Sequence, residues 1–160
     1  LVICMETDLE MEKAGQYFSG LDHTELGLIP LMRKMWKQEL TNGGRDYRFA
    51  IKIPELMQKF GLSGVGVRIS DSAYFINPYS NKEEHTKQCD AFTTAWGWNK
   101  ELSNEEKDAY IDSLRNRGLN AKEAEMFINS KQKIREYLIE NKENASIIKA
   151  PCTIISYGIK

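Results

Sequence analysis

The sequence is poor in the residue types that carry redox and metal chemistry. Only three of its 160 residues are cysteine and two are histidine. Cys4, Cys89 and Cys152 lie far apart without CxxC spacing, and His23 and His85 do not join them at zinc-ligand spacing. An odd and sparse set of cysteines favours free thiols in a reducing cytoplasm. The pattern therefore argues against a disulfide framework or a metal site and predicts a cytoplasmic protein.

Long apolar runs and an excess of one charge are missing too. No apolar run approaches the roughly 20 residues that span a membrane, and no secretory signal is visible. Lysine and arginine total 22 against 23 acidic residues, and the two signs are interspersed. This distribution is typical of solvated faces, so we expect neither a nucleic-acid nor a membrane partner. The 41% hydrophobic content and the length fit one ordinary globular domain.

Hydrophobic spacing predicts strands and helices in alternation. The expected strands are 1–6, 65–70 with 74–76 as a continuation or second piece, and the last run at 153–157, which Pro151 separates from Ile147–Ile148. One expected helix begins near residue 22 and ends at 42–44. The other expected helices cover 53–60, 81–96, 103–117 and 120–141. This order predicts an α/β fold.

Several ends of these helices carry recognisable capping chemistry. Pro54 suits a first helical turn and Gly61 a C-terminal cap. Ser103 and Glu106 have the spacing of a capping box, in which each side chain binds a backbone N–H of the other residue. Asn120 begins the last helix with similar chemistry.

The first strand is a continuous apolar run, Leu1–Met5, followed by polar residues. A run without alternation is typical of a central parallel strand, whose two faces are both covered by helices. Cys4, inside this strand, is then expected to be buried and inert. Such a strand needs neighbours, so we expect that a segment preceding it has been lost or removed.

Four stretches of the sequence carry a resemblance to a known family: Leu1–Glu6, Arg45–Asp46, Ile53–Leu62 and Val65–Arg68. In these stretches the chain resembles class I S-adenosylmethionine-dependent methyltransferases of the small-molecule and quinone-modifying kind. By resemblance, Leu1–Glu6 is the family's fifth strand, the run from Val65 its sixth, and Thr153–Gly158 its seventh, antiparallel beside the sixth. The implied fold is a partial Rossmann-like methyltransferase sheet, with residues 1–160 its C-terminal part and 81–145 a helical insertion. Arg45–Asp46 is expected to be a loop ion pair.

The resemblance implies methyl transfer from S-adenosylmethionine to a small-molecule acceptor. The family binds this cofactor with a glycine-rich loop that follows a strand. Here the one similar run, Gly61–Gly66, precedes a strand and is interpreted as a helix cap and strand entry. No cofactor-binding residue is therefore assigned, and the chain is expected to supply the substrate side. Its expected partner is a second copy or a missing N-terminal half. A non-catalytic α/β protein-interaction module is the alternative.

Candidate substrate-binding residues lie in two groups. Glu6 and Asp8 follow the first strand, at the edge where open α/β sheets bind ligands, although polar residues are also common at strand exits. Trp36, Tyr47 and Arg48 could line the same pocket, with core packing as the alternative for Trp36. No catalytic residue is assigned, because an in-line methyl displacement depends mainly on positioning.

The remaining candidates are aromatic or histidine side chains. Trp96 and Trp98, with Phe92 nearby, are expected to form either a substrate lid or a small core within the insertion. His23 and His85 could act as general bases. Neither has a carboxylate at a diagnostic spacing, so we expect both to be surface histidines.

Overall fold

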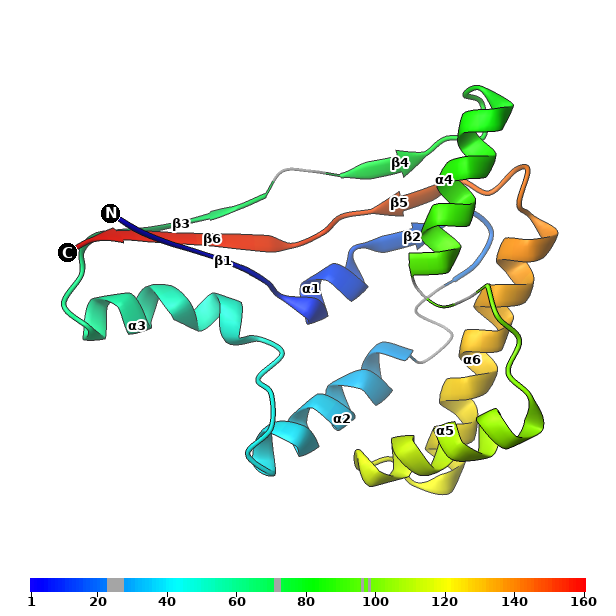
Figure 1. Ribbon diagram of the computed structural model, residues 1–160, viewed down its shortest axis with the longest axis horizontal. Coiled ribbons are helices and arrows are strands. Elements are labelled where there is room, and N and C mark those ends of the chain that lie inside the picture. The colour runs from blue at the N-terminus through cyan, green and yellow to red at the C-terminus, as the bar shows by residue number, and fades with distance from the viewer. Residues whose placement is uncertain (23–27, 71–72, 96, 98) are drawn as a thin grey trace.

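The computed structural model describes residues 1–22, 28–70, 73–95, 97 and 99–160. These residues form two three-stranded antiparallel sheets, six α-helices and one 3₁₀ helix (Figure 1). In chain order the elements are β1 (Val2–Thr7), α1 (Leu9–Ala14), β2 (Gln16–Phe18), α2 (Leu28–Thr41), η1 (Phe49–Lys52), α3 (Ile53–Lys59), β3 (Ser63–Ile69), β4 (Tyr74–Ile76), α4 (Lys82–Ala95), α5 (Asn104–Asn116), α6 (Ala121–Glu140), β5 (Ile147–Lys149) and β6 (Thr153–Ile159).

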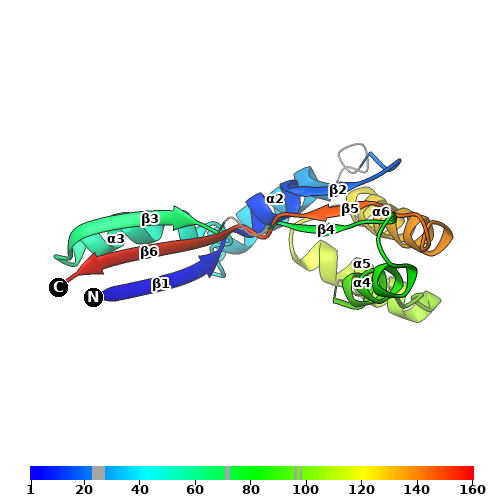
Figure 2. The ribbon, with the colours of Figure 1, turned by 90° about the horizontal axis from the view of Figure 1, so that it is seen from above.

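The two sheets follow one another along the long axis of the molecule (Figures 1 and 2). Their strand orders are β1-β6-β3 and β2-β5-β4, with β6 and β5 in the centre. Three stretches of the chain each supply one strand to the first sheet and one strand to the second sheet. Pro151 stands between β5 and β6, where a residue without a backbone N–H interrupts a sheet. The predicted α/β class is confirmed, and the strands are divided between two small sheets.

The first strand differs from its prediction. β1 pairs antiparallel with β6, from Val2 opposite Gly158 to Thr7 opposite Thr153, and it is an edge strand of the described sheet. Ile3 and Met5 are 58% and 65% exposed. The expected central parallel strand, buried on both faces, is therefore wrong for the described residues. An unbroken apolar run shows hydrophobicity but not which elements cover it.

The final strand pairs as the sequence predicts. β6 runs antiparallel beside β3, with Ser156 opposite Val67 and Ile154 opposite Ile69. Ile154 is buried against Ala50 and Cys152 on the side where α3 contacts the sheet. The expected burial along β3 is wrong, because Val67 and Ile69 are more than half exposed.

Glycines mark the predicted helix ends. After α2, Gly43 has φ of 76°, and after α3, Gly61 has φ of 80°. Glycine adopts this left-handed conformation without a Cβ penalty, so both helices end where predicted. Pro54 lies in the first turn of α3, as expected. The expected start of the earlier helix, near residue 22, extends into 23–27, which are outside the described residues.

The main core lies between one face of the β2-β5-β4 sheet and the helices α2, α4, α5 and α6. Phe18, Ile76 and Ile147 supply the sheet side, and all three are buried. The Phe18 ring meets the Phe92 ring edge-on at 5.9 Å between centroids, and the Tyr137 ring at 6.3 Å. Among the described helices, none combines the length and apolarity needed to cross a membrane.

The capping box at the start of α5 predicts a measurable stability effect. Ser103 Oγ accepts the Glu106 backbone N–H at 3.2 Å, and Glu106 Oε2 accepts the Ser103 N–H at 2.9 Å. We expect Ser103→Ala to lower the free energy of unfolding by about 1 kcal/mol, because one N-terminal N–H loses its acceptor. Urea denaturation measures this. Ser113→Ala, the same change at an exposed position within α5, is the control; equal midpoints for the two variants would show that the cap contributes nothing.

Lys13, in the last turn of α1, predicts a pH dependence of stability. Burial lowers its pKa from the usual 10.5 to about 8, Glu12 opposes the shift, and Lys149 and Lys131 add to it. Between pH 8 and 10.5 the unfolded chain then binds more protons than the folded one, so this group makes stability rise with pH. Relative to Lys13→Met, the wild type should gain on the order of 1 kcal/mol from pH 7.5 to 10, since partial exposure screens the full shift. Thermal denaturation across this range tests it, and a constant difference between the two proteins would contradict it.

Candidate functional site

Asp8 forms the turn at which β1 ends and α1 begins. Its side chain is fully buried, and Oδ1 accepts the Met11 backbone N–H at 2.9 Å as the N-cap of α1. Oδ2 has no hydrogen-bond donor among the described residues but lies 3.6 Å from Arg48 Nε. A buried carboxylate needs such a partner, because burial without one is costly. Asp8 therefore connects the strand exit to the segment before η1.

Beside this turn lies a cavity of about 280 Å³, which we call the α2 pocket. It is lined by residues of α1, α2 and 46–52, including Glu10, Arg33, Trp36, Tyr47 and Arg48. The Trp36 and Tyr47 rings stack with centroids 5.2 Å apart and an interplanar angle of 24°. Trp36, Tyr47 and Arg48 line this pocket together, whereas Glu6 and Asp8, which were expected at the same pocket, are not part of its lining. Trp36 is also buried, so it packs and lines the pocket at once.

The charged residues of the α2 pocket give it a positive balance. Arg33, Lys37, Arg48 and Lys52 supply four positive charges, and Glu10 and Asp46 two negative ones, a difference of two. Arg33 Nε donates to Glu10 Oε1 at 2.9 Å, and Lys52 Nζ donates to Asp46 Oδ2 at 2.5 Å. The hydrogen bond from Lys52 lowers the pKa of Asp46, which therefore remains ionised. An aromatic wall with excess positive charge suits a flat, anionic ligand.

Glu6 lies next to the α2 pocket without lining it. Its Oε1 accepts the Thr7 backbone N–H at 3.0 Å and lies 4.0 Å from an Arg45 guanidinium nitrogen. Arg45 in turn lies 5.3 Å from the centroid of the Tyr47 ring. The predicted ion pair between Arg45 and Asp46 is wrong, because Arg45 turns to Glu6 and Tyr47 while Asp46 binds Lys52. Adjacent residues on a turning backbone often point to different partners.

The Tyr47 hydroxyl is poorly suited to act as a general base. Its hydrogen bond with the Glu39 carboxylate raises the pKa of Tyr47, so the phenol keeps its proton. Glu39 also accepts from Arg117, which ties α2 to the end of α5. Tyr47 thus offers a fixed ring rather than a base. Arg33, Lys37 and Glu39 were not among the predicted site residues, because the helical pattern marks them simply as solvent-facing. Glu10 was also missed, because residues 9–20 show no clear periodicity.

The other candidates do not reach this pocket. His85 is buried, not on the surface as predicted, and its Nε2 lies 2.8 Å from the carbonyl oxygen of Ala145. The cause is the long-range contact between α4 and the segment before β5. Phe92 belongs to the main core. His23, Trp96 and Trp98 are outside the described residues.

Comparison with known proteins identifies no family for this chain. No protein-family model matches the chain, and no curated protein is significantly similar to it. Within the described residues, no three histidine, cysteine or acidic side chains gather as a metal site would require. The α2 pocket and the strand order are therefore the observations on which function can be argued.

Proposed function

We propose that this chain forms the substrate side of a methyltransferase that moves a methyl group from S-adenosylmethionine to a small-molecule acceptor. In this proposal the acceptor occupies the α2 pocket and the cofactor is held by other residues. Sequence resemblance suggests the reaction, and the arrangement of β1, β6 and β3 is the structural observation that carries the proposal.

The strand order supports the proposal at the level of topology. By resemblance, β1, β3 and β6 correspond to the family's fifth, sixth and seventh strands. A seventh strand is then expected beside the fifth and antiparallel to the sixth. The structure has β6 between β1 and β3 and antiparallel to both. The outer edge of β1, which has no partner among the described residues, is where the family's fourth strand would pair.

The α2 pocket supports the proposal at the level of chemistry. It lies beyond the C-terminal end of β1, on the side of the sheet where α/β enzymes bind ligands. Methyl transfer from a sulfonium is an in-line displacement, so a site can work by holding the acceptor in one orientation. Stacked Trp36 and Tyr47 offer a rigid flat wall, and Arg48, fixed by Asp8, offers a hydrogen-bond donor. We infer an acceptor with an aromatic or planar body and an anionic group.

Glu6 gives a first functional prediction. In the full-length gene product, Glu6→Gln should lower the rate of methyl transfer about tenfold, because Arg45 would lose the carboxylate that orients it against Tyr47. The melting temperature should change little, since the Glu6–Arg45 pair is exposed and weak. A radiolabelled methyl-transfer assay and a thermal melt measure both. Glu143→Gln, at another exposed ion pair, is the control; unchanged activity in Glu6→Gln would remove Glu6 from the site.

One observation favours the second candidate function, a non-catalytic protein-interaction module. Tyr17, Ile148 and Phe75 lie in register across the β2-β5-β4 sheet, on the face opposite the core, and all three are exposed. Such a row is apolar surface that another protein could cover. In this alternative, Ile148→Ser should abolish partner binding. S-adenosylmethionine-dependent turnover by the full-length gene product would rule out a purely non-catalytic role.

A further inference from the structure

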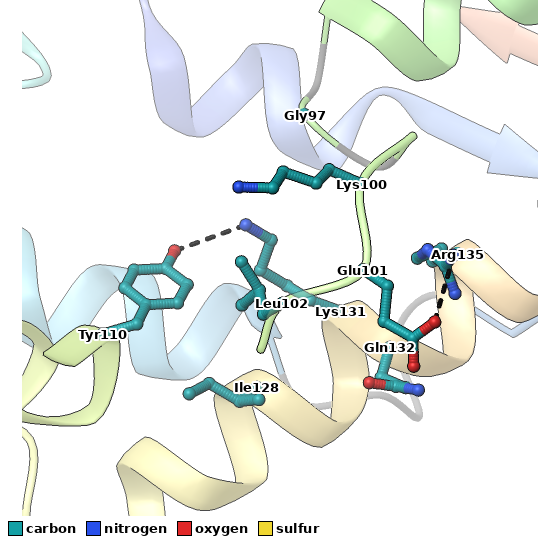
Figure 3. Close-up of a pocket in the computed structure, with 9 residues that line it drawn as sticks. All are labelled: Gly97, Lys100, Glu101, Leu102, Tyr110, Ile128, Lys131, Gln132 and Arg135. Carbon is teal, nitrogen blue, oxygen red and sulfur yellow. Dashed lines mark hydrogen bonds and ion pairs between the residues drawn. The ribbon is translucent and has the colours of Figure 1, made fainter. Parts of the chain in front are cut away.

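A second pocket lies far along the chain from the α2 pocket, between α5, α6, Gly97 and residues 100–102. It is lined by Gly97, Lys100, Glu101, Leu102, Tyr110, Ile128, Lys131, Gln132 and Arg135 (Figure 3). We call it the α5–α6 pocket. Its interior measures about 70 Å³, whereas one water molecule requires roughly 10–15 Å³ of comparable space. The pocket therefore has room for a group larger than a single water molecule.

Positive charge dominates the lining of this pocket. Lys100, Lys131 and Arg135 contribute three positive charges and Glu101 one negative charge, a difference of two. In Figure 3 the side chains of Lys100 and Lys131 extend in the same direction, towards the end of the pocket where Tyr110 lies. Lys131 Nζ donates to the Tyr110 hydroxyl at 3.4 Å and lies 5.0 Å from the centroid of its ring. Lys100 is also paired with Glu106, which is outside the lining.

Arg135 is the group whose bonding is least complete. Its side chain is only 20% exposed, and its Nε has no hydrogen-bond acceptor among the described residues. One guanidinium nitrogen lies 3.8 Å from Glu101 Oε2, which is longer than a good hydrogen bond. A buried guanidinium N–H without an acceptor is costly, and the weak pairing with Glu101 leaves the Arg135 charge incompletely neutralised at this end of the pocket. Tyr110 is held in place by edge-on contact with Phe127 at 6.4 Å.

We propose that the α5–α6 pocket binds the carboxylate or phosphate group of a small ligand. At one end of the pocket Lys100 and Lys131 supply ammonium donors and the Tyr110 hydroxyl a neutral donor, and at the other end Arg135 adds a guanidinium charge beside Glu101. Charge-assisted bonds of this kind are the strong ones in protein recognition of oxyanions. Leu102 and Ile128 add apolar surface for the body of an organic anion. This inference does not depend on methyl transfer, because it uses none of the residues of the α2 pocket.

The test is calorimetric titration of the purified chain with inorganic phosphate and, separately, with malonate as a dicarboxylate, at constant ionic strength set by sodium chloride. We expect at least one anion to bind with a Kd below about 1 mM. Phosphate binding alone assigns a phosphate ligand, and malonate binding alone assigns a carboxylic acid. Failure of both anions to bind would overturn the proposal.

Substitutions of the pocket residues test whether the anion binds in the α5–α6 pocket. Lys131→Gln and Arg135→Gln should each weaken it at least about tenfold, and Tyr110→Phe, which keeps the ring, about two- to tenfold. Lys133→Gln, at an exposed position of α6 outside the lining, is the matched control and should bind like the wild type. Circular dichroism checks that each variant folds, and Tyr110→Phe provides the test if a charge variant does not. Equal affinity in the wild type and the pocket variants would overturn the proposal.

Discussion

Tyr47→Ala in the full-length gene product is expected to lower the rate of methyl transfer about a hundredfold. The Tyr47 ring stacks on Trp36, and the Arg45 guanidinium lies 5.3 Å from its centroid, so its removal takes away one wall of the α2 pocket. A small displacement of a bound reactant is enough for a loss of this order. The measurement is the single-turnover rate at saturating S-adenosylmethionine.

Two matched variants make this prediction specific. Tyr79→Ala is the same chemical change at a side chain that is 95% exposed, and it should leave the rate unchanged. Tyr47→Phe keeps the ring and loses only the hydrogen bond to Glu39, so most of the activity should remain. Equal rates for Tyr47→Ala and Tyr79→Ala would place the acceptor elsewhere.

The largest expected effect on stability comes from Asp8. Asp8→Ala should lower the free energy of unfolding by about 2–3 kcal/mol, because it removes the N-cap of α1 and leaves the Met11 N–H without its acceptor in a buried turn. Asp8→Asn keeps an acceptor of the same shape and loses only the attraction to Arg48, so it should cost about 1 kcal/mol.

Urea denaturation of the two Asp8 variants tests this order. Asp108→Ala, at an exposed position of α5, is the control and should change stability by less than about 0.5 kcal/mol. If Asp8→Asn were as destabilising as Asp8→Ala, the charge rather than the cap would be what the turn requires.

Local chemistry in the sequence was sufficient to predict helices α2 to α6, but not α1. Ser103 and Asn120 begin helices, and Gly43 and Gly61 follow helix ends, because capping depends on residues only a few positions apart. Strands β1, β3, β4 and β6 were also located correctly. Their burial was not predicted correctly, because exposure depends on which elements lie against each face of a sheet. The spacing of Ile3 and Val67 in the sequence does not contain that information.

The site was predicted in outline only. Trp36, Tyr47 and Arg48 stand near one another because the predicted turn after α2 brings the chain back across that helix. The role of Glu10 was invisible because residues 9–20 show no clear periodicity, although they contain α1 and β2. His85 was misplaced on the surface because its partner, Ala145, is 60 positions away in the sequence.

Calorimetric titration with S-adenosylmethionine most directly tests the proposal that this chain binds the methyl acceptor while other residues hold the cofactor. The substrate-side role predicts micromolar binding by the full-length gene product and binding at least about a hundredfold weaker by residues 1–160 alone, whose glycine-containing run Gly61–Gly66 leads into a strand instead of following one. Micromolar binding by residues 1–160, or no binding by the full-length gene product, would contradict it.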